Sequence, residues 1–275
     1  MTPPTLLSLH VHPVKALGGI PCAEMLVQPW GPAGDRRWVV SSPAGVALTQ
    51  REHPRLALAT AEPRPGGAVR ISAPGRAALS LPAPLGDAEA AVVTVAGTKV
   101  EGLRGPAEAE AWFGEFLGTE AELVHLDAPA VRRPLGPEFA RPDGTVSFAD
   151  GAPLLLTSVS SLDALNSLVA QGDHAGEAPL PMDRFRPNVV VEGAAPWAED
   201  GWRRLRIGEV VFDVAMACSR CVVTTTDQST AVRGKEPLRT LARHRRLGDR
   251  LPFGQLLVPE RPGRMRSGDS VEVLE

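Results

Sequence analysis

Tyrosine is absent from this 275-residue sequence, and the chain has only five tryptophans and seven phenylalanines. A core built from it must therefore consist mainly of Val, Leu, Ala and Ile. Lysine is also scarce, since only three of the 29 basic residues are lysines and the rest are arginines. Together with 27 prolines and 27 glycines, this bias is typical of a GC-rich genome, so a single arginine or proline carries little information.

Three cysteines cannot form a disulfide framework, and their odd number favours a reducing compartment. No stretch approaches the roughly 18 uninterrupted apolar residues of a membrane span, and the first residues lack a basic leader. The net charge of −3 argues against a nucleic-acid or anionic-membrane surface. We therefore expect a cytoplasmic protein with no membrane and no nucleic acid among its stable partners.

The first half of the sequence predicts short strands separated by Gly and Pro turns, which is typical of an all-β sandwich or barrel. The expected strands cover residues 6–14, 38–40, 46–48, 56–60, 68–71, 78–81 and 91–95. One helix is predicted over residues 106–117, where Ala109, Trp112, Phe113 and Phe116 recur at helical spacing. Residues 127–143 are rich in Pro and Arg, and we interpret them as a connection between two domains.

The second half mixes strands with a few helices. A helix is predicted from Ser160, with Asp163 completing a variant capping box and Gly172 as the stop. A short helix is expected over residues 236–245, and strands over 153–157, 188–191, 205–207, 210–215, 255–258 and 270–274. Strands and helices do not alternate regularly, which argues against a doubly wound parallel sheet. The predicted class is therefore a β-rich α+β protein with domains at 1–126 and 127–275.

The segment Cys218-Ser219-Arg220-Cys221 closes one apolar run and opens another. An adjacent arginine favours thiolate over thiol, and thiolate is the form that binds metals or attacks. Thioredoxin-like chemistry requires a helix after the motif, whereas the β-branched residues 222–226 favour a strand. Four-cysteine iron–sulfur ligation is excluded by count, and the chain offers no further ligands at zinc spacing. Two half-buried small residues without a chemical role remain an equal alternative.

Three basic residues lie at the edges of predicted strands: Lys15, Arg36 and Arg186. Each is either a rim salt bridge or part of a convergent anion site, for which arginine is well suited. The basic groups at residues 132–133, 203–204 and 244–246 are predicted to be solvated. The nucleophile-elbow, P-loop and dinucleotide-binding motifs are absent from the sequence.

Several segments, taken together in their order, resemble the MOSC superfamily of molybdenum-cofactor-binding proteins. Within it, the sequence is similar to the mitochondrial amidoxime-reducing components and the bacterial YcbX-type proteins. The segments are His12-Pro13-Val14-Lys15, Gly34-Asp35-Arg36-Arg37-Trp38, Phe185-Arg186-Pro187-Asn188, Ala217-Cys218-Ser219-Arg220-Cys221, Lys235-Glu236-Pro237-Leu238, Phe253-Gly254-Gln255 and Gly268-Asp269. The resemblance implies an N-terminal MOSC-type β-barrel domain over 1–126 and a MOSC β-barrel with a few flanking helices over 127–275.

The resemblance also implies that the chain binds the molybdenum cofactor (Mo-molybdopterin), with Cys221 as the metal ligand. Asp150 is implied as a group near the metal, while Cys218 receives no role. The pyranopterin and its phosphate would be held by Lys15, Arg36, Arg186, Asn188, Ser219 and Arg220. Ala16 and the pair Gly151-Ala152 stand where relatives can carry hydroxyl groups.

The function implied by this resemblance is molybdenum-dependent reduction of N-hydroxylated compounds: amidoximes, hydroxylamines and N-hydroxylated bases. The sequence shows no ferredoxin module after residue 221, so electrons would come from a separate ferredoxin-like or cytochrome b5-like protein with its reductase. An alternative is a cofactor carrier or sulfur-transfer module that uses Cys221 without a pyridoxal-phosphate domain of its own. A third interpretation is a β-barrel binding protein in which the cysteine pair is incidental.

Overall fold

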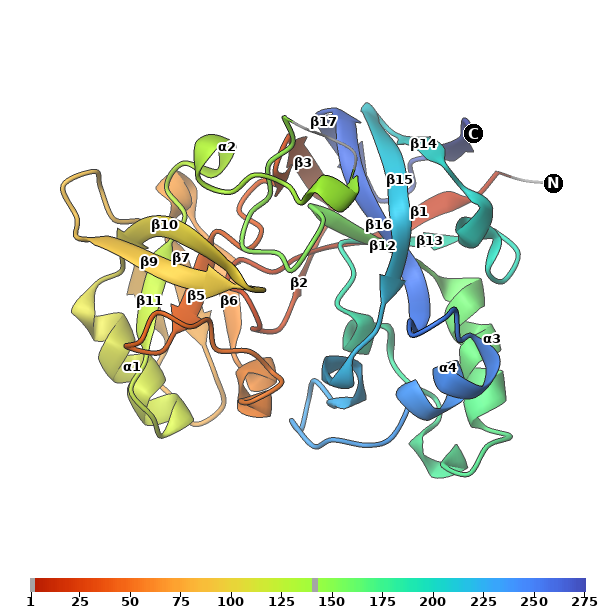
Figure 1. The fold of residues 1–275 in the computed structure, drawn as a ribbon, viewed down its shortest axis with the longest axis horizontal. Coiled ribbons are helices and arrows are strands. Elements are labelled where there is room, and N and C mark those ends of the chain that lie inside the picture. The colour runs from red at the N-terminus through yellow and green to blue at the C-terminus, as the bar shows by residue number, and fades with distance from the viewer. Residues whose placement is uncertain (1–2, 140–142) are drawn as a thin grey trace.

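The computed structural model describes residues 3–139 and 143–275, and it confirms a β-rich α+β fold in two parts. Figure 1 shows two lobes side by side. The first lobe comprises the strands β5–β11 and helix α1, and the second lobe comprises the remaining strands with helices α3 and α4. Among the described residues, no helix is long and apolar enough to cross a membrane.

The second lobe is built on an eight-stranded sheet in the order β18-β14-β15-β16-β12-β13-β1-β2. Its strands are β1 (Thr5–Val11), β2 (Ile20–Cys22), β12 (Leu154–Ser158), β13 (Val189–Glu192), β14 (Arg204–Ile207), β15 (Val210–Ser219), β16 (Pro252–Arg261) and β18 (Val271–Val273). A three-stranded sheet joins β17 (Gly263–Arg266), β3 (Glu24–Gln28) and β4 (Gly31–Pro32). Leu6, Leu9, Met25 and Met265 are buried in one core with residues of β12–β16.

The first strands of the chain therefore pack with its second half rather than with the first lobe. β1 pairs antiparallel with β13, with Thr5 opposite Glu192 and Leu9 opposite Val189. The predicted division of the sequence at residues 126 and 127 remains a prediction. In space, β1–β4 lie across that division because their apolar faces complete the core of the second lobe.

The first lobe packs two small sheets around helix α1 (Ala107–Leu117), which is the helix predicted from the aromatic spacing. One sheet has the order β5-β11-β10-β9 and the other β6-β7-β8. The bounds are β5 (Trp38–Ser41), β6 (Thr60–Pro63), β7 (Val69–Ser72), β8 (Leu79–Leu81), β9 (Ala90–Val95), β10 (Thr98–Arg104) and β11 (Glu122–His125). Trp112, Phe113 and Phe116 are buried in its core, and Gly118, with a positive φ of 70°, ends the helix.

Two helices cover one end of the second lobe, α3 (Val159–Val169) and α4 (Leu238–His244). The predicted start and stop of α3 are wrong. Ser158 rather than Ser160 occupies the N-cap, no side chain caps that end, and Ala170 rather than Gly172 is the C-cap. Because Ser158 already ends β12, the helix follows the strand directly.

Three predicted strands also differ from the structure. Residues 46–48 form only isolated bridges, and a short 3₁₀ helix, Pro54–Leu58, replaces most of the strand expected at 56–60. After Cys221 the chain forms the 3₁₀ helix Val222–Thr225, because the Thr224 and Thr225 hydroxyls donate back to carbonyls three residues earlier. The expected connection at 127–143 contains the short helix α2 (Pro129–Arg132), and its residues 140–142 lie outside the described part of the chain.

Candidate functional site

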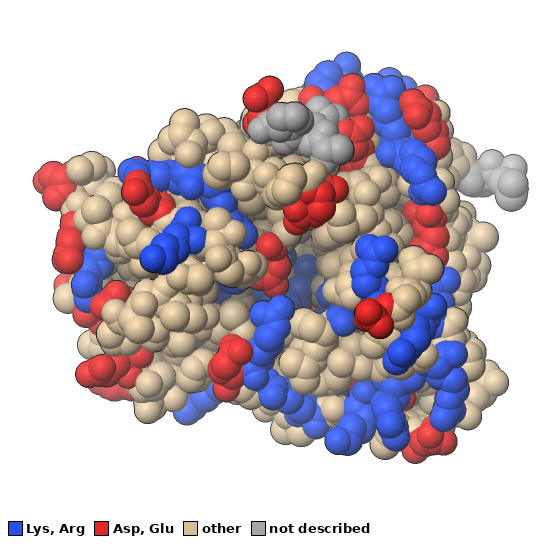
Figure 2. All heavy atoms as spheres, in the orientation of Figure 1, with Lys and Arg blue, Asp and Glu red and all other residues tan. Residues whose placement is uncertain are grey.

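A cavity of about 420 Å³ lies between the two lobes and is the best candidate for a functional site. Figure 2 shows the molecular surface hollowed there, with basic side chains in its depth. All eight residues predicted for the site line this cavity, although they come from five separate segments of the sequence. They are Lys15, Arg36, Asp150, Arg186, Asn188, Ser219, Arg220 and Cys221.

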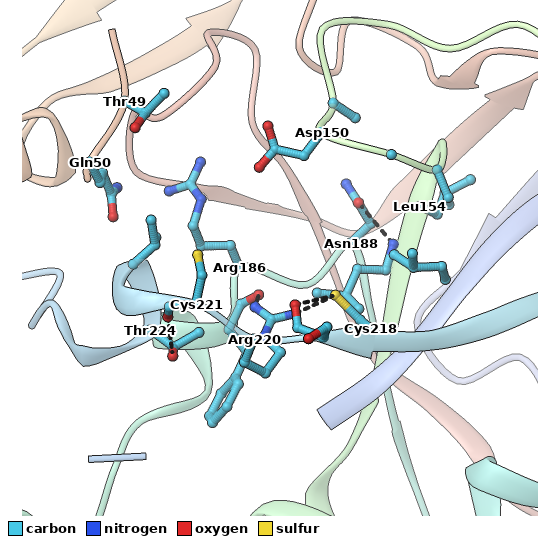
Figure 3. Close-up of a pocket in the computed structure, with 18 of the residues that line it drawn as sticks. Thr49, Gln50, Asp150, Leu154, Arg186, Asn188, Cys218, Arg220, Cys221 and Thr224 are labelled. Carbon is cyan, nitrogen blue, oxygen red and sulfur yellow. Dashed lines mark hydrogen bonds between the residues drawn. The ribbon is translucent and has the colours of Figure 1, made fainter. Parts of the chain in front are cut away.

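Cys221 sits at the point where β15 ends and the chain turns into the 3₁₀ helix. The Arg220 amide donates to the Leu251 carbonyl at 2.9 Å, which fixes the turn on the neighbouring segment. The amide and hydroxyl of Thr224 both donate to the Cys221 carbonyl, at 3.0 and 2.9 Å. The backbone of Cys221 is thereby held while its half-buried thiol points into the cavity (Figure 3).

The two cysteines of the motif have different surroundings, and both are free thiols. The guanidinium of Arg220 donates through Nη1 to the Cys218 sulfur at 2.8 Å and through Nη2 to the Phe185 carbonyl at 2.7 Å. Figure 3 shows the Cys218 sulfur joined to Arg220, whereas the Cys221 sulfur faces the open cavity. The Cys221 sulfur has a longer contact, 3.7 Å to Arg51 Nη2, and is thus the more available of the two thiols to a ligand.

Lys15 and Asp150 form an ion pair at the wall of the cavity. The Lys15 ammonium is buried and also donates to the Phe148 carbonyl at 2.8 Å. Burial lowers the pKa of Lys15, and the Lys15 charge holds the pKa of Asp150 well below its ordinary value. The side chain of Asp150 is 59% exposed, so its carboxylate faces the cavity as an anion at neutral pH.

Asn188 holds the Arg36 side chain in place through a hydrogen bond. Its Oδ1 accepts from Arg36 Nη1 at 3.0 Å and from the Leu155 amide at 3.3 Å. Its Nδ2 donates to the His10 carbonyl and to Asp35 at 3.0 and 3.1 Å. These bonds use the full capacity of a buried amide side chain, so Asn188 positions Arg36 and Asp35 rather than offering free donors to a ligand.

Arg186 has the clearest unfilled hydrogen-bonding capacity for a ligand in the cavity. It has a positive φ of 56°, and its Nη1 is buried without a hydrogen-bond partner among the described residues. Burial, together with the nearby charge of Arg36, lowers the pKa of Arg186 to about 9. A buried donor on a cation is costly unless an acceptor meets it. An anionic group in the cavity would satisfy it.

The excess of positive charge on the cavity wall also favours an anionic ligand. Of the residues that the structure describes, six cations line the cavity, namely Lys15, Arg36, Arg51, Arg186, Arg220 and Arg250, against one acid, Asp150. Such a set fits a phosphate-bearing anion with several acceptor oxygens, and the Cys221 sulfur fits a soft metal carried by the same group. Among the residues that the structure describes, no group of three or more His, Cys, Asp or Glu could hold a metal ion.

Sequence reasoning missed the contribution of the loop before the first 3₁₀ helix. Thr49, Gln50 and Arg51 reach the cavity from the first lobe. The Gln50 side chain is buried, donates to the Ala16 carbonyl at 2.7 Å and pairs with Gln228 of the second lobe at 3.1 Å. Neither composition nor periodicity distinguishes this loop from an ordinary turn.

Arg133 was predicted to be solvated, and this is wrong. It is buried, and its guanidinium donates to the carbonyls of Ser147 and Ala149. These bonds hold the segment that carries Asp150 against the cavity. A dipeptide of two arginines does not reveal that one of them has carbonyl partners elsewhere in the chain.

Comparison with known proteins identifies the family. Residues 4–120 match the model of the MOSC N-terminal beta barrel domain, and residues 143–272 match that of the MOSC domain. Mitochondrial amidoxime-reducing component 1 of Homo sapiens is 35% identical over 290 residues, covering 98% of this chain and 83% of that protein. Molybdenum cofactor sulfurase of Oryza sativa subsp. japonica is 32% identical over 92% of this chain, but over only 32% of its own length.

The chain therefore belongs to the MOSC-domain proteins that carry an N-terminal MOSC β-barrel domain, as the sequence motifs indicated. More particularly, it is a molybdenum-cofactor-related member, similar to the amidoxime-reducing components over nearly its whole length. Among solved structures, the YUAD protein from Bacillus subtilis is 10% identical with a TM-score of 0.43, covering 98% of this chain and 94% of that one.

Proposed function

We propose that this protein is a molybdenum-cofactor-dependent reductase of N-hydroxylated compounds such as amidoximes, hydroxylamines and N-hydroxylated bases. One observation carries the proposal: the Cys221 thiol opens into a cavity whose wall holds, among other cations, a buried Arg186 donor that has no partner in the described part of the chain. The relatives named amidoxime-reducing components support the reaction class.

The residues fit the cofactor by charge and by donor type. Arg36, Arg186 and Arg220 would hold its phosphate and pterin oxygens, with Lys15 adding positive charge. Asn188 would act through Arg36, and Cys221 would ligate the metal. When bound, the cofactor would supply the two-electron chemistry that removes oxygen from an N–O bond. Ser219, whose exposed side chain lines the same wall, would add a hydroxyl donor.

Asp150 would orient the substrate. Because Lys15 keeps its carboxylate ionised, the cavity-facing oxygens are acceptors for the N–H and O–H groups of an amidoxime. Reduction of an amidoxime to an amidine consumes two electrons and two protons and releases water. We assign the electrons to a separate ferredoxin-like or cytochrome b5-like carrier with its reductase, and we propose a cytoplasmic location.

The Cys221→Ser variant tests the assignment, with Cys218→Ser as its matched control. Both proteins are made in a host that synthesises the cofactor, and molybdenum, pterin and benzamidoxime reduction are measured with a reconstituted electron donor. We expect Cys221→Ser to lose metal and activity while it remains folded, and Cys218→Ser to keep both. Full activity in Cys221→Ser would refute the proposal.

A second candidate function is cofactor carriage or sulfur transfer through Cys221. It is favoured by the similarity to molybdenum cofactor sulfurase, although this chain matches only about a third of that protein. The two functions differ in what the purified protein holds. Persulfide on Cys221 in intact-mass spectra, without stoichiometric molybdenum, would favour sulfur transfer over reduction.

A further inference from the structure

Arg51 is the one residue of the first lobe whose charged side chain contacts both Cys221 and Asp150 among the described residues. Its Nη2 lies 3.7 Å from the Cys221 sulfur and 3.8 Å from Asp150 Oδ2. The side chain is 42% exposed, so it stands where the cavity meets solvent. In Figure 3 the neighbouring Thr49 and Gln50 lie across the cavity from Asn188, Leu154 and Cys218.

The loop that carries Arg51 is held by several hydrogen bonds, so its guanidinium has a defined position at the cavity. Gln50 bonds to Ala16 and Gln228, and Arg233 Nη2 donates to the carbonyls of Gln50, at 2.6 Å, and of Arg51, at 2.5 Å. Both side-chain contacts of Arg51 use the same nitrogen, and both are longer than an ideal hydrogen bond. A guanidinium has five N–H donors, so most of its capacity remains for a ligand.

The charge of Arg51 is only partly offset by its long contacts to Asp150 and Cys221. Asp150, the one acid among the described residues of the wall, is already paired with the buried ammonium of Lys15 at a much shorter distance. Arg250, also on the wall, adds a further positive charge. The cations assigned to the cofactor are different residues, so the Arg51 guanidinium remains available to bind a substrate in the cavity.

We propose that Arg51 determines specificity and makes the site prefer N-hydroxylated substrates that carry a carboxylate or another anionic group. This inference rests on the proposed function and names the substrate class within it. The guanidinium fork binds a carboxylate through two parallel bonds, while Asp150 accepts from the N-hydroxyl end of the same molecule. A cationic substituent would be repelled from the same position.

The test compares three benzamidoximes that differ in the para position: carboxylate, hydrogen and aminomethyl. The value of kcat/KM is measured for each with the loaded wild-type protein and with Arg51→Gln and Arg51→Lys. Arg55→Gln is the matched control, because Arg55 is an exposed arginine nearby in the sequence that lies over Phe116 and does not line the cavity. Molybdenum and pterin contents are measured for every variant.

We expect wild type to prefer the carboxylate substrate and Arg51→Gln to lose about tenfold in kcat/KM for it, through KM, while the neutral substrate changes little. Arg51→Lys should restore part of the preference, and Arg55→Gln should behave as wild type. Equal kcat/KM for the three substrates in wild type would overturn the inference. So would loss of cofactor in Arg51→Gln, which would place Arg51 in the cofactor cradle. Failure of wild type to reduce any of the three would instead remove the proposed function itself.

Discussion

The ammonium of Lys15 pairs with the carboxylate of Asp150, which follows it 135 residues later in the chain. The pair is asymmetric, since Lys15 is buried and Asp150 is open to the cavity. Lys15 therefore favours the ionised form of the Asp150 carboxylate, which a ligand in the cavity can contact. This relationship makes the cavity sensitive to acid in a way that can be measured.

The Asp150→Asn variant is expected to have a flatter stability profile at low pH than wild type. The pKa of Asp150 is lower in the folded chain than its ordinary value of 3.8, so the unfolded chain binds a proton first as the pH falls. The contribution of this carboxylate to stability is present above about pH 4 and is lost as the pH falls further. Urea denaturation between about pH 5 and pH 2 measures the slope in each protein.

At neutral pH the same variant should be less stable than wild type, because Lys15 then keeps a buried charge without its partner. Asp87→Asn, at an exposed carboxylate on the loop between β8 and β9, is the control and should reproduce the wild-type profile. An unchanged acid slope in Asp150→Asn would show that the ion pair does not persist in solution.

Replacement of Arg186 should separate stability from cofactor binding. Because its guanidinium has a buried donor without a partner in residues 3–139 and 143–275, Arg186→Met is expected to leave the cofactor-free protein as stable as wild type or more stable by about 1 kcal/mol. The same change should abolish retention of the cofactor. Chemical denaturation of cofactor-free protein and pterin analysis of loaded protein give the two readouts.

Arg184→Met is the matched control, two residues away. Arg184 is buried and its Nε also lacks a partner among the described residues, but its Nη1 donates to the Thr225 carbonyl at 3.3 Å and its Nη2 to Asp227 at 3.4 Å. Its loss should therefore cost about 1–3 kcal/mol. Equal destabilisation by the two substitutions would mean that the Arg186 guanidinium is already satisfied without a ligand.

Asn188→Leu is expected to reduce the free energy of unfolding by about 2–4 kcal/mol, because four hydrogen bonds end on this buried amide. Asn166→Leu, at a half-buried position with two bonds to Leu180, should cost about 1–2 kcal/mol. Urea denaturation of cofactor-free protein compares them. A smaller loss at position 188 than at 166 would contradict the role of Asn188 as the support of Arg36.

Gly254, in β16 close to the cavity, should tolerate no side chain. Its φ is +78°, and an added Cβ would lie 2.5 Å from the Leu156 carbonyl oxygen. We expect Gly254→Ala to cost about 3 kcal/mol or more, the sum of backbone strain and a clash with fixed backbone. Gly75→Ala, with a φ of +71° and open space around it, isolates the strain and should cost about 1 kcal/mol. Similar melting temperatures for the two variants would exclude the clash.

The eight predicted site residues lie in short motifs that can be read from the sequence, and all eight line the cavity, but their roles remain predictions. Arg36 and Arg186 both have positive φ values, a constraint that the sequence does not display but that turns both side chains towards one cavity. Arg51 could not be found, since its role depends on Gln50 meeting Gln228 and on Arg233 holding the loop.

The fold was predictable in class but not in the placement of its first strands. Alternation over residues 6–14 indicated a strand, and β1 is one, yet the pattern does not say which sheet receives it. The partner β13 lies more than 170 residues later, and pairing at that separation leaves no local signal. The residues after Cys221 likewise favoured a strand by propensity, whereas hydroxyl-to-carbonyl bonds formed a 3₁₀ turn instead.

The pairing of β1 with β13 also constrains the order in which the protein can fold during its synthesis. While the ribosome is still making the first lobe, β1 can pair with β2 but not with β13, because β13 has not yet been translated. The sheet of the second lobe can be completed only after β13 has been synthesised and has paired with β1 at the start of the chain. A fragment of residues 127–275 expressed alone should therefore show an open strand edge at β13, seen as aggregation that co-expression of residues 1–126 relieves.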